Sequence, residues 1–380
     1  MTTSTPSVSD ALTVPITRAI AAAGGWLPFD AFMHAALYTP GLGYYAHGSQ
    51  KFGLFPARVV GGQAQTGSDF VTAPELSPLF GACLAEQVAQ ALQASGTRCV
   101  YEFGAGSGAM ALQINELFTS SHQGLEQYCI VDVSGSLRAR QQDKLAKFGS
   151  RVQWLDTLPE RIEGVVLGNE VLDAMPVKLL VRTQGVWHER GVVRSTAPAA
   201  PPPFSWEDRP TTLRPSVEIA GSHDYLTEIH PQAEAFIRTI AQQLSRGAAF
   251  LIDYGFPEAE YYHPQRHMGT LMCHYQHQAD PDPLDRVGEK DITAHVNFTG
   301  IALAGQEAGL DVLGYCSQAR FLMNCGLLQK MELLTPMQRG LAAKLATEHE
   351  MGELFKVIGF GKGMDFEPIG FSQGERSHTL

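Results

Sequence analysis

The feature that most constrains the fold is a regular alternation of short apolar runs and amphipathic stretches. The run CVYEFG at 99–104 ends in glycine, and a helical pattern over 109–118 follows it. Six more apolar runs continue the alternation, at 127–133, 152–155, 164–172, 248–255, 311–316 and 355–361. Strands that alternate with helices form a parallel sheet with helices on both faces. The sequence therefore predicts an α/β fold with a doubly wound sheet of seven strands.

The remaining segments lie outside this alternation. Helical patterns at 15–23, 29–37 and 78–94 precede the first strand, and a proline cluster within 184–222 indicates a loop or an edge hairpin. Residues 257–300 are rich in His, Asp and Pro. We expect four consecutive parts: an N-terminal helical arm and lid (1–95), the core with the 184–222 insertion (96–256), an inserted helical and loop cap (257–310), and C-terminal strands that complete the sheet (311–380).

Composition narrows the function classes. The chain has 28 Lys and Arg against 39 Asp and Glu, a formal net charge of −11. This balance disfavours binding to the phosphate backbone of nucleic acids, and it is compatible with a cationic substrate. No stretch of about 18 uncharged apolar residues is present, so we expect no membrane insertion.

Cysteine and histidine usage bears on compartment and on metal binding. The six cysteines form no CxxC pair, and the first residues resemble neither a secretory leader nor a transit peptide. We therefore expect a cytoplasmic protein with reduced cysteines. The histidines lack the H-E-x-x-H spacing and a companion cysteine pair, so we expect no metal site.

The turn after the first strand is a candidate ligand loop. Gly104, Gly106 and Gly108 allow a sharp turn and a close approach of a ligand to the backbone, and the next helix offers free N–H groups. By spacing alone the segment also fits the dinucleotide fingerprint G-x-G-x-x-A through Ala109. An NAD-dependent oxidoreductase is therefore one alternative, although no Tyr-x-x-x-Lys signature accompanies the turn.

Two carboxylates favour a different nucleoside cofactor. Glu102 lies two residues before the first glycine, where it suits a ligand that carries an ammonium group better than one that carries pyrophosphate. Asp132 ends the second strand, where a carboxylate accepts hydrogen bonds from ribose hydroxyls. Each also has a structural alternative, as a helix cap or as a solvated strand end. Together they favour S-adenosylmethionine (SAM).

An acidic turn follows the fourth strand. The string GNEVLDAMPV places Asn169, Glu170 and Asp173 past the carboxyl end of this strand, which is the ligand crevice of a doubly wound sheet. One helical turn would bring Glu170 and Asp173 to the same face, where paired carboxylates could hold a guanidinium. The alternative is a helix-capping cluster.

Several strings, in order along nearly the whole chain, resemble the MidA-like SAM-dependent methyltransferases. They are ALYTPGLGYY (36–45), SDFVTAPELSPLFG (68–81), EFGAGSGAM (102–110), GNEVLDAMPV (168–177), IDYG (252–255), DITAHVNF (291–298) and QARFL (318–322). The resemblance implies a class I methyltransferase fold, which is Rossmann-like, with N-terminal and inserted helical segments. Mitochondrial members of the family assist assembly of respiratory complex I, and one is assigned symmetric dimethylation of an arginine.

The resemblance assigns roles residue by residue. It implies catalytic roles for Asn169, Glu170 and Asp173, which would orient a guanidinium. The cofactor-binding set is Glu102, Gly104, Ala105, Gly106, Gly108, Asp132, Val133, Asp156, Thr72 and Pro74. The substrate-binding set is Tyr44, Tyr45, Asp69, Glu75, Asp253 and Tyr254, where the two N-terminal tyrosines either form a lid or only pack, and Asp253 and Tyr254 either contact substrate or brace the fold.

The expected function is methyl transfer from SAM to an arginine of a protein substrate, such as a complex I subunit. The alternatives are a methyltransferase for a small molecule or another side chain, and an assembly chaperone that binds SAM without turnover. The sequence does not name the target protein, and it leaves open a homodimer.

Overall fold

The computed structural model describes residues 7–46, 58–60, 63–65, 72–121, 124–132, 135–195, 203–276 and 278–380. The chain folds as two compact units, each built from three separate segments. Unit 1 comprises 1–49, 173–233 and 258–295, and unit 2 comprises 50–172, 234–257 and 296–380. The four consecutive parts expected from the sequence are a different division, and their boundaries stay a prediction.

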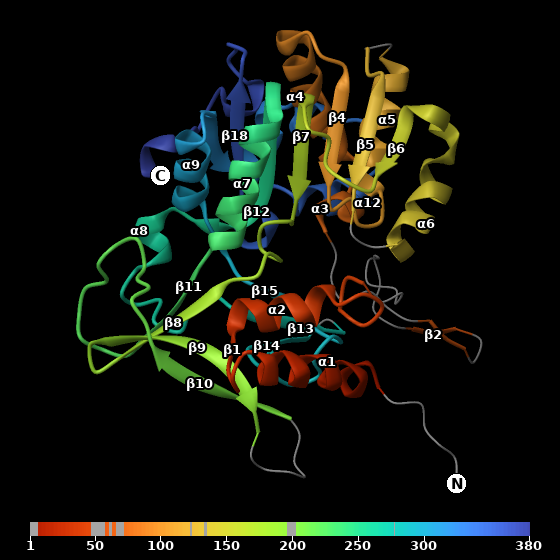
Figure 1. The fold of residues 1–380 in the computed structure, drawn as a ribbon. Helices are drawn as coiled ribbons and strands as arrows, with labels where there is room; N and C mark the ends of the chain where they lie inside the picture. The colour runs from red at the N-terminus through yellow and green to blue at the C-terminus, as the bar shows by residue number, and fades with distance from the viewer. Residues whose placement is uncertain are drawn as a thin grey trace. The chain divides into compact units, whose positions relative to one another are not determined.

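Unit 2 contains the large sheet that the alternation predicts (Figure 1). Its order is β17-β18-β12-β7-β4-β5-β6, and the short β16 pairs with β12. The strands are β4 (Cys99–Phe103), β5 (Gln127–Val131), β6 (Val152–Leu155), β7 (Ile162–Asn169), β12 (Leu244–Phe256), β16 (Val296–Asn297), β17 (Asp311–Ser317) and β18 (Phe355–Lys362). The predicted α/β fold is confirmed, and all seven predicted strands are present.

The direction of one strand differs from the prediction. The pairs β12–β7, β7–β4, β4–β5 and β5–β6 are parallel, as expected. β18 is antiparallel to both β12 and β17, so the sheet is mixed. The apolar run of β18 is buried along nearly its whole length, like its parallel neighbours, and such a run carries no signal of direction.

Helices cover both faces of this sheet. Phe250, Ile252 and Val357 face the core cluster that contains α4, α5 and α10. On the other face, Phe360 of β18 lies against Gly305 of α9. The helices of unit 2 are α3 (Ala73–Leu76), α4 (Leu79–Ser95), α5 (Ala109–Ser120), α6 (Gly135–Leu145), α9 (Phe298–Glu307), α10 (Gln318–Asn324), α11 (Leu327–Met331) and α12 (Pro336–Ala343), and α7 (Pro231–Gln243) begins in unit 1 and continues in unit 2.

Shorter pieces complete unit 2. A small hairpin joins β2 (Arg58–Val60) and β3 (Gln63–Gln65). Among the described residues, short 3₁₀-helical segments are η1 (Ala146–Arg151), η3 (Ile369–Phe371) and η4 (Ser377–Thr379), and η2 (Glu348–Gly352) is a short π-helical segment.

Unit 1 packs two helices on antiparallel sheets. The order of the larger sheet is β1-β9-β8-β11, with β10 paired to β9. Its elements are α1 (Val8–Ala22), β1 (Leu27–Pro28), α2 (Phe29–Tyr38), β8 (Lys178–Thr183), β9 (Val186–Arg194), β10 (Phe204–Pro210) and β11 (Tyr225–Ile229). β9 and β10 pair in antiparallel fashion. This agrees with the edge hairpin, which is one of the two alternatives predicted for 184–222.

The predicted cap at 257–310 begins with strands rather than with helices. Of the described residues from 257 to 297, only α8 (Glu258–Tyr261) is helical, and β13 (Met272–Tyr275), β14 (Gln278–Asp280) and β15 (Asp291–Thr293) form a three-stranded antiparallel sheet. These strands have three or four residues, which is too short for a clear alternating pattern in a segment rich in Asp and Pro.

α1 begins at Val8, earlier than the predicted start at Pro15. Ser7 and Asp10 form a capping box, in which each side chain accepts from the other residue's backbone N–H. A capping box pairs N–H groups of the first turn that would otherwise lack a partner, so it fixes the start of the helix at Val8. Pro15 therefore lies inside the helix rather than at its start. Within the described residues, no helix is long and apolar enough to cross a membrane.

Close packing of backbone in the sheet gives a first prediction. A Cβ atom at Gly164 of β7 would overlap the carbonyl oxygen of Cys99 in β4. We expect Gly164→Ala to lower the free energy of unfolding by about 2 kcal/mol or more, because backbone atoms cannot move aside cheaply. Gly340→Ala in the exposed α12 meets nothing within 4 Å and should be neutral or slightly stabilising. Denaturant unfolding followed by circular dichroism measures both, and equal stability of the two variants would contradict this packing.

Candidate active site

The glycine turn leaves the carboxyl end of β4. The Gly104 N–H donates to Val131 O of β5 at 3.1 Å, which joins the ends of two neighbouring strands. Gly104, Gly106 and Gly108 have φ values of 63°, 53° and 77°, in the left-handed region that favours glycine. Gly108 is the N-cap of α5, so the first turn of this helix points its free N–H groups toward the loop. Ala105, between the first two glycines, is buried.

Glu102 is buried at the end of β4, at 1% exposure. The Tyr128 hydroxyl of β5 donates to Glu102 Oε2 at 2.6 Å. Burial raises the pKa of Glu102 to about 8, the Tyr128 hydrogen bond lowers it, and the nearby Asp132 raises it. A carboxyl in this state ionises readily only when a cation lies beside it.

Asp132 is aligned by a residue that the sequence analysis missed. Gln141 of α6 is fully buried, and its Nε2 donates to Asp132 Oδ2 at 2.8 Å and to Gly106 O at 2.9 Å. Its Oε1 accepts from Trp154 Nε1 at 2.9 Å. One amide therefore holds the glycine loop, the carboxylate after β5 and the strand β6 in one arrangement. The sequence carried no motif for it, because the contact joins elements nine and 35 residues apart.

α3 lies beside the same loop. Glu75 accepts a hydrogen bond from the Ser107 hydroxyl, and Lys144 Nζ lies 3.7 Å from Glu75 Oε1. Gln113 Nε2 of α5 donates to Pro74 O at 2.7 Å. Thr72 is the N-cap of α3, and its predicted role in cofactor binding stays a prediction. The Ser107 bond joins Glu75 to the glycine loop, and the predicted role of Glu75 in substrate binding stays a prediction.

The remaining site candidates do not form any of the hydrogen bonds described above. Asp156 follows β6 and is largely exposed, and it forms an ion pair with Arg138. Val133 and Asp69 lie outside the described residues, so their predicted roles stay predictions.

The turn after β7 has an unusual backbone. Glu170 has φ 53°, a left-handed conformation that is rare for a residue with a side chain. Its N–H donates to Ile252 O of β12 at 2.9 Å, and its Oε1 accepts from Asn169 Nδ2 at 2.9 Å. The helical turn expected to align Glu170 with Asp173 is wrong, since the chain forms a non-helical turn there and Asp173 belongs to unit 1.

Asp253 holds this turn in place. It is fully buried, and its Oδ2 accepts from the backbone N–H groups of Val171 (3.2 Å) and Leu172 (2.9 Å). Its Oδ1 accepts from the N–H of Tyr254 at 2.9 Å. Of the two roles predicted for Asp253, this geometry supports the brace rather than a contact with substrate. Tyr254 is partly buried and packs edge-on against Phe355 of β18, with ring centroids 5.4 Å apart.

A second cluster of acidic side chains lies in unit 1, beside two tyrosines. Tyr38 donates to Ala174 O at 2.9 Å, and Tyr45 donates to Asp291 Oδ1 at 2.8 Å. Burial and the charges of Asp291 and Asp173 raise the pKa of both tyrosines well above the ordinary value. Tyr44 is buried and packs edge-on against Tyr45, with ring centroids 5.1 Å apart, and its predicted role in substrate binding stays a prediction. Of this group, the sequence analysis assigns substrate or catalytic roles to Tyr44, Tyr45 and Asp173 and no role to Asp291.

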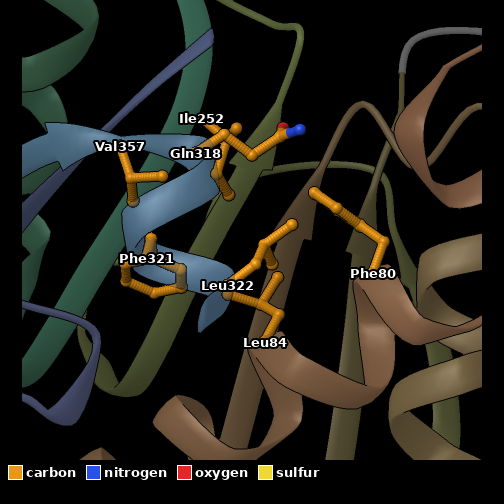
Figure 2. A pocket seen from close by; sticks show the side chains of 7 residues that line it. All are labelled: Phe80, Leu84, Ile252, Gln318, Phe321, Leu322 and Val357. Atoms are coloured by element: carbon orange, nitrogen blue, oxygen red, sulfur yellow. The ribbon is translucent and has the colours of Figure 1, made fainter. Parts of the chain in front are cut away.

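A metal site and a small apolar pocket are two further possible ligand sites. Among the described residues, no group of three or more His, Cys, Asp or Glu side chains is arranged to hold a metal ion. A small pocket in unit 2 lies between α4, α10, β12 and β18 (Figure 2). Its space is too small for a water molecule. Its lining residues are Phe80, Leu84, Ile252, Gln318, Phe321, Leu322 and Val357.

Comparisons with known proteins identify the family. Residues 83–316 match the model of a family described as "Putative S-adenosyl-L-methionine-dependent methyltransferase". This chain belongs to that family. A crystal structure titled a "likely methyl transferase" from Burkholderia thailandensis, bound to S-adenosyl-homocysteine, is 50% identical, with a TM-score of 0.90 over 98% of this chain and 97% of that one. A second structure from the same organism is 48% identical, with a TM-score of 0.87 and the same coverage.

More distant relatives carry a more specific name. The zebrafish (Danio rerio) mitochondrial protein arginine methyltransferase NDUFAF7 is 26% identical over 356 residues, 84% of this chain and 78% of that protein. The human protein of this name is 25% identical over 334 residues, 80% of this chain and 70% of that protein.

The predicted cofactor, SAM, and the methyltransferase class are confirmed at the level of the family. The residues present fit this cofactor. Glu102 is a buried carboxyl with a raised pKa, which a neighbouring cation would lower, and Asp132 is an acceptor held in place at the end of the next strand. The glycine turn between them allows a ligand to approach the backbone. Glu102 would face the ammonium group and Asp132 the ribose.

Gln141 gives a prediction on cofactor affinity. Gln141→Glu places a second carboxylate against Asp132 Oδ2 and Gly106 O, so we expect the affinity for SAM to fall roughly tenfold to hundredfold. Gln142→Glu changes the neighbouring, exposed position of the same helix and should leave the affinity unchanged. Calorimetric titration with SAM measures both. An unchanged affinity in a folded Gln141→Glu protein would show that Gln141 does not position Asp132.

Glu102 gives a prediction on pH. At pH 7 a carboxyl with a pKa of about 8 is mostly protonated, and the SAM ammonium favours its ionised form. Binding should therefore release up to about 0.9 proton at pH 7. Calorimetry in two buffers of different ionisation enthalpy measures this number, and Glu102→Gln should abolish it. Equal heats in the two buffers for the wild type would contradict the assignment.

The same pKa predicts a stability effect without ligand. The folded chain holds this proton more tightly than the unfolded chain, because the pKa rises from 4.5 to about 8 on folding. Glu102 therefore lowers the stability as the pH rises from about 4.5 to about 8. Glu102→Gln stays neutral, so the ligand-free variant should be more stable than the wild type at pH 8, and this advantage should shrink at pH 5.

Proposed function

We propose that this protein transfers a methyl group from SAM to a terminal guanidinium nitrogen of an arginine in a protein substrate. The observation that carries the proposal is Glu170, a carboxylate held in a strained left-handed conformation at the carboxyl end of β7. Strained residues of this kind concentrate at functional sites. The relatives named as protein arginine methyltransferases support the choice of acceptor.

The chemistry explains why a carboxylate is needed at this place. When bound, SAM supplies an electrophilic methyl group on a sulfonium and leaves as S-adenosylhomocysteine. A guanidinium is a weak nucleophile because its lone pairs are delocalised. A carboxylate that accepts N–H bonds from one side localises the positive charge there and accepts the proton that the attacking nitrogen loses. A new N–C bond forms as the S–C bond breaks, and the sulfur keeps the electron pair.

The residues of the turn divide this work in our proposal. Glu170 accepts from the guanidinium and takes the proton. Asn169 orients Glu170 through its Nδ2 bond to Oε1. Asp253 fixes the backbone of the turn through Val171 and Leu172. Close alignment of the acceptor nitrogen supplies much of the rate in such a displacement.

Two variants of Glu170 test this role. Glu170→Gln keeps the oxygen that accepts from Asn169 but loses the charge, so we expect methyl incorporation to fall at least about a hundredfold with SAM affinity nearly unchanged. Glu170→Gly should be equally inactive but at least as stable as the wild type, because glycine adopts φ 53° without strain. Glu163→Gln changes an exposed residue of the same strand and serves as the control.

The measurement is transfer of labelled methyl groups from SAM into the proteins of a cell extract, followed by acid hydrolysis and chromatography of methylarginines. Label in methylarginine that disappears in both Glu170 variants is the expected result. Label in small molecules or in other side chains would support the corresponding alternative acceptor. SAM binding without any transfer would indicate an assembly protein that uses SAM as a ligand. Full activity of Glu170→Gln would overturn the role of this residue.

A further inference from the structure

The side chain of Val171 fills a space between the glycine turn and the acidic turn of unit 2. A Cβ atom at Gly104 would lie 3.0 Å from Val171 Cγ2, and one at Gly168 would lie 3.5 Å from the same atom. Phe103, which precedes Gly104, is the register partner of Gly168 in the pairing of β4 with β7. The two glycines therefore leave a space at the ends of these strands, and Val171 occupies it.

Hydrogen bonds and side-chain shape hold Val171 in this place. Its N–H donates to Asp253 Oδ2 at 3.2 Å, and the N–H of Glu170, one residue before it, donates to Ile252 O at 2.9 Å. A β-branched side chain has few rotamers available, so Val171 is a stiff spacer. The residue is only partly buried, so it keeps accessible surface at this edge of the sheet.

The covalent order of SAM relates this contact to the reaction. In the cofactor, the sulfonium lies between the amino-acid group and the ribose. Glu102 would face the ammonium and Asp132 the ribose, so the sulfonium would lie near the turn that begins at Gly104. Glu170, which is bonded to Val171, carries the carboxylate that accepts the guanidinium in the proposed function. Val171 thus links the loop for the methyl donor to the residue for the methyl acceptor.

We propose that Val171 is a positioning residue for methyl transfer, which sets the separation between the cofactor loop and the acceptor carboxylate. This inference rests on the proposed function, since it takes Glu170 as the group that binds the acceptor. The N–C bond forms in line with the breaking S–C bond, the sulfur keeps the electron pair, and the proton of the acceptor nitrogen passes to Glu170. A misplacement of about 1 Å can slow such a step about a hundredfold. A smaller and a larger side chain at Val171 should therefore both lower the rate.

NMR tests the place of Val171 at the cofactor without any methyl transfer. In the full-length protein with ¹³C-labelled valine methyl groups, the Val171 signals should shift on saturation with S-adenosylhomocysteine. The signals of Val166 should stay nearly unchanged, because this residue is fully buried in the middle of β7. Val171→Ala and Val166→Ala each remove one pair of signals and so assign them. Unchanged Val171 signals in protein that binds S-adenosylhomocysteine would overturn the proposal.

A series of side chains separates spacing from stability. In the methyl-transfer assay at saturating SAM, Val171→Ala and Val171→Ile should each lower kcat about tenfold to hundredfold, since the first leaves a gap and the second adds bulk between the turns. Val171→Thr keeps the branched shape and adds a hydroxyl, so stability should fall while kcat stays within about threefold. The dissociation constant for SAM, measured by calorimetry, should stay within about threefold in Val171→Ala. Val166→Ala is the matched control, which should lower the stability and leave kcat unchanged.

The outcomes separate this proposal from the function it rests on. Methylarginine formation that requires Glu170 but keeps the wild-type kcat in Val171→Ala and Val171→Ile would overturn the proposal and leave the function standing. Label on another side chain, with kcat lowered in both variants, would support the spacing role and overturn the arginine acceptor. SAM binding without any transfer in the wild type would overturn both. An equal loss of kcat in Val166→Ala would make the effect one of stability and overturn the positioning role. If Val171→Ile does not fold, Val171→Ala carries the test.

Discussion

The hydrogen bonds of the buried Asp253 carboxylate are the interaction on which the carboxyl ends of the central strands in unit 2 depend. It accepts three backbone N–H groups, from Val171, Leu172 and Tyr254, where β7 and β12 end side by side. These groups would otherwise be orphan donors in a turn that forms no helix. The bond from the Glu170 N–H to Ile252 O completes the arrangement. A residue with a side chain keeps φ 53° only when its surroundings hold it there. Asp253 contributes to this constraint by fixing the two residues that follow Glu170.

Two buried acids of unit 2, Asp253 and Glu102, show how the same chemical group serves two purposes. Asp253 is surrounded by backbone donors and stabilises the apo protein. Glu102 has one neutral hydroxyl donor, and burial raises its pKa to about 8. The Glu102 carboxyl is therefore poorly solvated until a cation binds beside it. The ligand-free protein loses stability at this residue, and binding of the ligand's ammonium group would restore it. Trade-offs of this kind are typical of binding sites.

Much of the fold could be predicted because its signals are local. Each strand of the large sheet is a short apolar run next to a helical pattern, and the glycines that need positive φ follow β4 directly. What could not be predicted depends on contacts between distant elements. The direction of β18 is not encoded in its own composition. Gln141 acts through Asp132 and Trp154, which adjoin it only in the folded chain. Asp291 sits in a segment whose strands are too short to show alternation.

The order of strands in unit 2 also has a consequence for how the protein is made. β17 is synthesised before β18, yet in the described part of the sheet β18 is its sole neighbour. On the ribosome, β17 therefore emerges without a ladder to join, and β12 keeps an open edge until the last strand inserts between them. Unpaired edges in nascent chains invite association with other chains. Completion of this sheet thus waits for β18, which follows all its other strands in the chain.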